Sequence, residues 1–219
     1  MDRITVKRDI IEAGARMYQR QFVASNDGNI SVRISEDEII VTPTGVSKGF
    51  MREEDLITVN MDGKIVEGER NPSSEIKMHL AVYRNRPDVF AVCHAHPQKA
   101  TAFAVARQVW GKVALPEVIF SLGAIKLAQY ATPSTEEVPN SISEIIKTAD
   151  AVLLANHGAL TVGNDVFDAY YKMESLEHSA GIILYARLLG GEVGLEPEQV
   201  RQLIRVRMEK FGKSDLVIG

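Results

Sequence analysis

A β-hairpin signal in the first third of the chain restricts the possible folds more than any other feature. Two extended segments, 56–61 and 64–67, flank Asp62-Gly63, a dipeptide that favours a tight turn between antiparallel strands. Upstream, residues 30–34 alternate apolar and polar side chains and predict a half-buried strand, and residues 38–42 predict another. A chain with these segments is expected to build a mainly antiparallel sheet.

Apolar residues at helical spacing predict helices that cover this sheet. The first covers residues 4–22, and a second begins at 72–75, with Ser73 or Ser74 as its N-cap, and runs to about residue 84. Further helices are expected over residues 100–106 and 166–189 and from Pro197 to about residue 211. Another is expected to begin near Glu136, because Ser134 and Glu137 match a capping box. Short apolar runs at 89–94 and 151–155 predict buried strands, and 113–132 reads as extended pieces interrupted at Gly123. The mixture indicates an α/β layer architecture.

Length and charge narrow the class of protein. The 219 residues show no shift in composition, so we expect a single domain over 1–219. A net charge of −4 without a basic stripe argues against a nucleic-acid partner. No apolar run approaches the roughly 18–20 residues of a membrane span, and early charged residues argue against a signal peptide. The single cysteine, Cys93, excludes an intrachain disulfide, and we expect a cytoplasmic protein.

The segment His94-Ala95-His96 is the sharpest chemical feature of the chain. Residues two apart in a strand point to the same face, so both imidazoles would project together from the end of strand 89–94. Imidazole is a common ligand of zinc and similar cations, and a catalytic site keeps one position open for water or substrate. His157 follows the strand 151–155 and could supply a third ligand.

Taken alone, two histidines separated by one residue are explained at least as well as surface side chains whose hydrogen bonds are satisfied. His157 at a second strand end shifts the interpretation towards a metal. His79, four residues after Glu75, and His178, inside the long helix, are expected to be packed or hydrogen-bonded structural histidines. Cys93 should face the opposite side of its strand and belong to the core.

Three short segments are suited to binding an anion. Residues 26–29, Asn-Asp-Gly-Asn, could present backbone N–H groups in a tight turn, and residues 42–45, Thr-Pro-Thr-Gly, offer hydroxyls at a strand end. Residues 72–75, Pro-Ser-Ser-Glu, would place two hydroxyls at a helix N-terminus, where the macrodipole favours phosphate. Each segment alone is better explained as a turn, a strand end or a cap, and only their combination with the paired histidines indicates a phosphorylated ligand.

Glu75 directly follows the two serines in the first turn of the expected helix. Its simplest role is that of a capping carboxylate. Held between a phosphate and a metal ion, it could instead act as a general acid and base, because a bound cation would keep it ionised until substrate displaces it.

These motifs, in this order, resemble the class II aldolase/adducin family. The resemblance rests on GNISVR at 28–33, TPTG at 42–45, PSSE at 72–75, HAH at 94–96, YAT at 130–132 and NHGAL at 156–160. It extends from the first helix to about residue 211. It implies a three-layer α/β/α fold with a mainly antiparallel central sheet, assembled as a C4 homotetramer with active sites between subunits.

The resemblance also implies roles for individual residues. One divalent metal, zinc ahead of manganese, cobalt or iron, would be bound by His94, His96 and His157. Glu75 would be the acid/base and would also touch the metal in the resting site. The phosphate of a small phosphorylated sugar would be held by Gly28, Asn29, Thr44, Gly45, Ser73 and Ser74.

The reaction that the resemblance implies is metal-dependent cleavage of a ketose 1-phosphate into dihydroxyacetone phosphate and an aldehyde. Alternatives on the same site are aldolases of 5-deoxy- or methylthio-ribulose 1-phosphate, a decarboxylase, a dehydratase and a 4-epimerase. Ser-Ser-Glu at 73–75, where the epimerase pattern has Ser-Ser-Asp, argues against the epimerase. A non-catalytic adducin-like module is a further alternative, but such a module has no reason to keep the histidines together with Glu75.

Two tyrosines of the aldolase pattern have no match here. The first is expected in a strand after the histidine pair, and Phe120 stands in its place. The second is expected in the C-terminal tail, after residue 211. These phenols assist with the aldehyde, so their loss leaves the metal and phosphate sites intact and leaves the identity of the aldehyde open.

Overall fold

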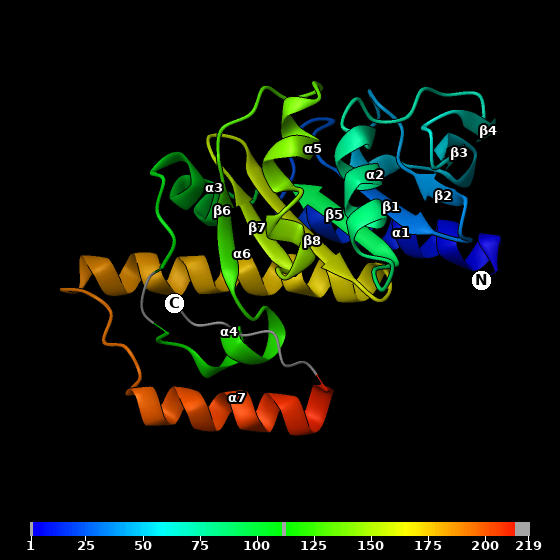
Figure 1. Ribbon diagram of the computed structural model, residues 1–219. Helices are drawn as coiled ribbons and strands as arrows, with labels where there is room; N and C mark the ends of the chain where they lie inside the picture. The colour runs from blue at the N-terminus through cyan, green and yellow to red at the C-terminus, as the bar shows by residue number, and fades with distance from the viewer. Residues whose placement is uncertain (1, 111–112, 213–219) are drawn as a thin grey trace.

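Eight strands form one sheet in the computed structural model, which describes residues 2–110 and 113–212 (Figure 1). The strands are β1 (Asn29–Arg33), β2 (Glu38–Val41), β3 (Ile57–Asn60), β4 (Ile65–Glu67), β5 (Ala91–Ala95), β6 (Ile125–Ala128), β7 (Ala151–Leu154) and β8 (Gly158–Gly163). Their order along the sheet is β4-β3-β2-β1-β5-β8-β7-β6. Among these strands only β6 and β7 pair in parallel, which confirms the mainly antiparallel sheet.

Helices cover both faces of this sheet. One face carries α1 (Arg3–Gln19), α3 (Gln98–Val105) and α6 (Val166–Leu188), and the other carries α2 (Ile76–Asn85) and α5 (Glu137–Ile142) (Figure 1). Neighbouring strand residues therefore enter different cores, as Cys93 packs with the first set of helices and Val92 with the second. The predicted α/β/α layers are confirmed, and Cys93 is a core residue as expected.

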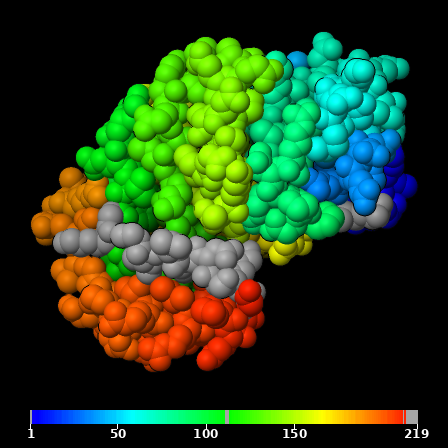
Figure 2. All heavy atoms as spheres, viewed as in Figure 1, coloured from blue at the N-terminus to red at the C-terminus, as the bar shows by residue number. Residues whose placement is uncertain are grey.

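Two further helices lie outside these layers. The short helix α4 (Pro116–Ser121) packs against α6 and against α7 (Pro197–Phe211). Figure 2 shows α7, in orange and red, as a rod of atoms along one end of the molecule. Three 3-10 turns complete the described elements: η1 (Lys48–Phe50), η2 (Glu53–Asp55) and η3 (Ile145–Lys147). No helix in residues 2–110 or 113–212 is long and apolar enough to cross a membrane.

The predicted hairpin forms as expected between β3 and β4. Gly63 adopts φ +80°, a conformation that costs glycine little. The Asn60 side chain stabilises the turn, because its Oδ1 accepts the backbone N–H groups of Asp62, at 3.1 Å, and Lys64, at 2.9 Å.

The prediction that β1 is half-buried is wrong. The strand lies between β2 and β5, with helices on both faces of the sheet, so its polar residues Asn29 and Ser31 are also buried. Buried polar side chains need hydrogen-bond partners, and theirs belong to α2, as described below.

Other predictions about local structure are also wrong. Residues 116–121 are helical rather than extended, because Pro116 suits a first helical turn and α4 packs against α6 and α7. The capping box at Ser134 is absent: Glu136 is the N-cap of α5, and the Glu137 carboxylate accepts the N–H of Thr132 at 2.8 Å. Strand β8 was not predicted at all.

Candidate metal and phosphate site

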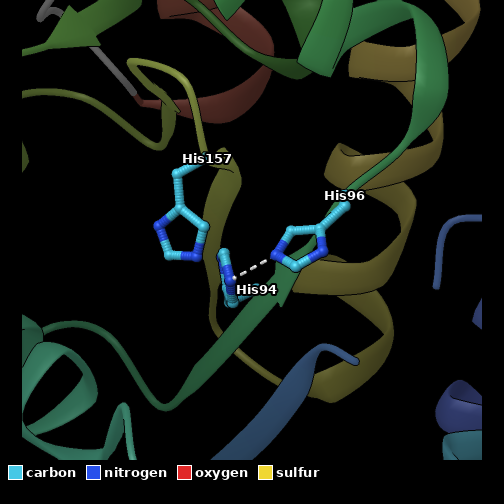
Figure 3. Close-up of side chains that lie close together, drawn as sticks. All are labelled: His94, His96 and His157. Carbon is cyan, nitrogen blue, oxygen red and sulfur yellow. Dashed lines mark hydrogen bonds between the residues drawn. The ribbon is translucent and has the colours of Figure 1, made fainter. Parts of the chain in front are cut away.

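Three histidine side chains converge beside the end of β5 (Figure 3). His94 lies in β5, His96 directly follows it, and His157 lies in the turn between β7 and β8. Each offers one ring nitrogen, and these nitrogens lie within 4.8 Å of one another. The histidines that the sequence singled out therefore come together as a group that could hold a metal ion.

The orientation of the His94 ring follows from one hydrogen bond. Its Nδ1 lies 2.9 Å from the carbonyl oxygen of Ala159 in β8, and since a carbonyl can only accept, Nδ1 is the donor. The other ring nitrogen, Nε2, is then free of hydrogen when the ring is neutral. It faces Glu75 Oε2 at 3.1 Å and His96 Nε2 at 3.2 Å.

Two glycines make room for these rings. A Cβ at Gly158 would lie 2.5 Å from the carbonyl oxygen of Ala95 and 2.6 Å from Cδ2 of His96. A Cβ at Gly28 would lie 2.5 Å from Val23 Cγ1 and 3.0 Å from the carbonyl oxygen of His94, and Gly28 also has φ +71°. Side chains at either position would displace the backbone or ring that builds the site.

Glu75 points its carboxylate at the histidines. Its Oε1 lies 3.2 Å from His157 Nε2, its Oε2 faces His94, and the Asn29 amide donates to Oε2 at 3.0 Å. Burial raises the pKa of Glu75, but His94, His157 and Asn29 outweigh it and hold that pKa well below its ordinary value. The carboxylate is thus ionised at neutral pH.

The prediction that Ser73 or Ser74 caps α2 is wrong. The N-cap is Glu75, and no side chain makes a capping bond there. The Ser73 hydroxyl accepts the N–H of Glu75 itself, at 3.3 Å. Because the Glu75 side chain turns towards the histidines, it does not act as a cap either.

The charges and lone pairs of this cluster fit a divalent cation. Glu75 Oε1 is buried and has no hydrogen-bond donor among the described residues. Burial and the neighbouring His94 lower the pKa of His157 to about 4, so that ring is neutral and keeps a lone pair to share. Burial by itself would lower the pKa of His94, but the Glu75 carboxylate outweighs burial and raises that pKa. The position of His94 therefore favours a positive charge.

A buried chain of hydrogen bonds supports the Asn29 amide. The register of β1 and β5 places Asn29 opposite His94. His79 in α2 approaches Asn29 Oδ1 with Nε2 at 2.5 Å, and its Nδ1 lies 2.6 Å from the hydroxyl of Ser31, which in turn lies 2.8 Å from Tyr83 Oη. With Nε2 as donor, His79 fixes the amide so that Nδ2 faces Glu75. The predicted structural role of His79 is confirmed.

The three predicted anion-binding segments also meet. Thr42 Oγ1 accepts the N–H of Ile30 at 3.1 Å, and the Thr42 carbonyl accepts the N–H of Ser73 at 3.2 Å. The N–H of Thr44 donates to the Asn71 carbonyl at 3.0 Å. Gly45 adopts φ +73° and has no atom within 4 Å of the place of a Cβ. These bonds link the 42–45 segment to the strand that follows residues 26–29 and to Ser73, beside Asn29 and Glu75.

Some site features were missed or misplaced from the sequence. Asp27, inside the 26–29 motif, approaches His96 Nδ1 with Oδ2 at 3.4 Å. His178 is exposed on α6, not packed as expected. Phe120 lies in α4, not in a strand, and lines a separate pocket with residues of α6 that include Asp168 and Tyr171. The second missing tyrosine was expected in the tail after residue 211, where residues 213–219 lie outside the described residues.

Comparisons with known proteins agree with this architecture. A family model described as Class II Aldolase and Adducin N-terminal domain matches residues 8–184. An L-fuculose phosphate aldolase of Methanococcus maripaludis is 36% identical over 164 residues, which cover 75% of this chain and 88% of that protein. A solved L-fuculose 1-phosphate aldolase has a TM-score of 0.84 and 32% identity, and the match covers 95% of this chain and 96% of that one.

Relatives with other substrates are nearly as similar. A 5-deoxy-D-ribulose 1-phosphate aldolase of Bacillus thuringiensis is 31% identical over 209 residues, covering 94% of this chain and 97% of that protein. A 3-oxo-tetronate 4-phosphate decarboxylase of Haemophilus influenzae is 31% identical over 184 residues, covering 82% of this chain and 87% of that protein. The shared feature of these names is a small phosphorylated carbohydrate.

Proposed function

The chain belongs to the class II aldolase and adducin family and is a lyase of that metal-dependent family, and from this premise we propose that it cleaves a ketose 1-phosphate into dihydroxyacetone phosphate and an aldehyde. The observation that carries the proposal is the position of Glu75. Its carboxylate faces His94 and His157 and accepts from the Asn29 amide, next to the segments that we propose hold the phosphate. A general acid/base for a phosphorylated substrate needs this placement.

We assign the residues as follows. His94, His96 and His157 would hold the divalent metal, zinc first among the candidates, and Glu75 would contact it in the resting site. When bound, the metal supplies Lewis-acid stabilisation of the negative charge that develops as the C3–C4 bond of the substrate breaks. The phosphate is held by Gly28, Asn29, Thr44, Gly45, Ser73 and Ser74.

Glu75 moves the proton at the carbon of the dihydroxyacetone phosphate fragment. In cleavage it accepts the proton that the C4 hydroxyl loses as the aldehyde forms and delivers it to C3, and in condensation the same transfers run in reverse. The Asn29 amide, fixed by His79, orients the carboxylate for this transfer. The same arrangement disfavours a non-catalytic module, since a binding module gains nothing from an ionised buried carboxylate beside three imidazoles.

Decarboxylation of a phosphorylated sugar acid is the competing reaction, supported by the relative from Haemophilus influenzae. An assay of dihydroxyacetone phosphate release across a panel of ketose 1-phosphates, with zinc, manganese, cobalt or iron added to metal-free protein, distinguishes the two. We expect release with at least one ketose 1-phosphate. Carbon dioxide release from a 3-oxo acid phosphate, without any cleavage of ketose phosphates, would contradict the proposal.

We also propose that the chain is a single domain and forms a homotetramer with active sites between subunits. The end of α6 and the segment after it support the assembly: α6 extends beyond the sheet (Figure 1), and Leu188, Leu189 and Val193 are exposed apolar residues, with Leu189 at 89% exposure. Light scattering of the purified protein tests this proposal, and a monomer at micromolar concentration would contradict it. A cytoplasmic location stays a prediction.

A further inference from the structure

Lys48 is a buried cation that none of the roles above uses. It opens η1, and only 1% of its surface is exposed. The described residues place no carboxylate oxygen within ion-pairing distance of its ammonium, and both hydrogen bonds that it donates to them go to backbone carbonyls. A buried charge without a partner is costly, so its presence requires an explanation.

The two carbonyls belong to the two loops proposed to hold phosphate. Lys48 Nζ donates to the carbonyl of Asn26 at 2.9 Å and to that of Val46 at 2.7 Å. Asn26 lies two residues before Gly28, and Val46 directly follows Gly45. One ammonium group therefore ties together backbone segments that are 20 residues apart in the sequence and that meet around the proposed phosphate position.

The electrostatic surroundings of the Lys48 ammonium indicate that a negatively charged ligand could serve as its counter-charge. Burial lowers the pKa of Lys48 to about 8, and the charge of Asp27 opposes that shift only in part. The ammonium remains charged at neutral pH, in an environment that does not neutralise it. A phosphate dianion bound on the adjacent loops would supply the opposite charge.

We propose that Lys48 is a positioning residue for the substrate phosphate: it sets the spacing of the two loops through their carbonyls and supplies the buried positive charge that favours a dianion. This inference rests on the proposed function, which places the phosphate on these loops. It predicts that Lys48 affects the phosphorylated substrate selectively. A lysine that was only packed in the core, with no part in phosphate binding, would not distinguish a phosphorylated ligand from an unphosphorylated one.

The test compares metal-loaded wild type with Lys48→Met, which keeps most of the length of the side chain and removes its charge. Lys64→Met is the matched control, because Lys64 is exposed in the β3–β4 turn. The measurements are the Kd for inorganic phosphate, the KM and kcat for dihydroxyacetone phosphate in the condensation direction, the reactivity of unphosphorylated dihydroxyacetone, and metal content.

For Lys48→Met we expect the phosphate Kd and the KM to rise by about tenfold or more. The kcat should change much less, and the metal content and the reactivity with dihydroxyacetone should stay near wild type. Phosphate binding as tight as in wild type, or an equal loss with dihydroxyacetone, would overturn the role of Lys48 and leave the proposed function standing. If wild type itself bound neither phosphate nor dihydroxyacetone phosphate, the proposed function would fail first.

A measurement on unchanged protein covers the case in which Lys48→Met does not fold. Lysine labelled with ¹⁵N at Nζ gives ammonium signals for the buried, hydrogen-bonded side chains of Lys48 and Lys172, whereas exposed lysines exchange quickly. The signal that remains in Lys172→Met belongs to Lys48. We expect this signal to shift as inorganic phosphate is added, with a midpoint at the phosphate Kd. A signal that stays in place at saturating phosphate would overturn the inference.

Discussion

The Nδ1–H of His94 donates to the carbonyl oxygen of Ala159 across the β5–β8 pairing, at 2.9 Å. Because this bond fixes the ring, Nε2 faces His96 and Glu75 and presents a lone pair to the centre of the cluster. Partners of this kind commonly orient the histidine ligands of metal sites. The strand pairing thus prepares the site before any ion binds.

Replacing His94 should therefore empty the site. We expect His94→Ala to lose bound metal and activity together, because two remaining imidazoles cannot complete the cluster. Elemental analysis of the purified protein and the cleavage assay measure both effects, and His178→Ala, at an exposed position on α6, is the control. A full complement of metal with normal turnover would show that the ligand assignment is wrong.

Glu75→Gln should separate binding from chemistry. The amide keeps the shape of the side chain but cannot accept a proton, so we expect turnover to fall by roughly 10²–10⁴-fold. Metal content and the Kd for inorganic phosphate should remain close to wild type. Near-normal turnover would mean that the carboxylate does not transfer the proton.

The double variant Ser73→Ala/Ser74→Ala should weaken phosphate binding with little effect on folding. No serine side chain caps α2, so the loss of about 0.5–2 kcal/mol that removal of a cap produces is not expected. The KM for the phosphorylated substrate should rise while the free energy of unfolding changes little. A less stable protein with an unchanged KM would favour a structural role for the two hydroxyls.

Acid should destabilise the metal-free protein through its buried neutral histidines. Burial lowers the pKa of His79 to about 3 and that of His157 to about 4, whereas both titrate near 6.5 when unfolded. At a pH between the folded and the unfolded pKa values, the unfolded chain binds more protons than the folded chain. The free energy of unfolding therefore falls as the pH falls from about 6.5. His94, whose pKa is raised, acts in the opposite sense and reduces the effect.

Urea unfolding of chelator-treated protein at pH 7 and pH 5 measures this change. His79→Gln removes one of the two groups and should flatten the dependence, even if the variant is less stable at both values. If the free energy of unfolding changed equally with pH in wild type and variant, His79 would not be a source of the pH dependence.

In the proposed tetramer, whose active sites lie between subunits, Phe120 would face the aldehyde from a neighbouring subunit, and the absence of a phenol there should leave the aldehyde loosely selected. A phenyl ring lacks the donor that a phenol offers, and an apolar pocket rejects a hydroxyl only weakly. We expect deoxy and short apolar aldehydes to react in the condensation direction, while dihydroxyacetone phosphate stays the strict partner. Comparison of kcat/KM for several aldehydes measures this, with Phe120→Tyr as the partner variant. A preference above about 200-fold for L-lactaldehyde would contradict it, since one hydrophobic contact discriminates only roughly 10–200-fold.

Residue patterns were sufficient where the cause is local. The turn at Asp62-Gly63 forms as predicted because glycine accepts φ +80° there, and helices α6 and α7 begin at or near the predicted residues. Residue patterns were insufficient where contacts with a distant segment determine the local structure. Ser73 and Ser74 satisfy the preferences of an N-cap, yet the chain enters α2 one residue later, at Glu75, because the segment before it is hydrogen-bonded to Thr42.

By itself, the sequence determined which chemical groups are present and which of them are neighbours along the chain: two imidazoles at 94 and 96, a carboxylate at 75 and three loops rich in hydroxyls and glycine. The tertiary structure alone decided what these groups face. Strand β8 places the Ala159 carbonyl on His94, and the β1–β5 register places Asn29 beside it. Strand register and helix packing depend on contacts between distant segments, which local spacing does not encode, and for that reason the supporting bonds of His79 and the buried ammonium of Lys48 became visible only in the folded chain.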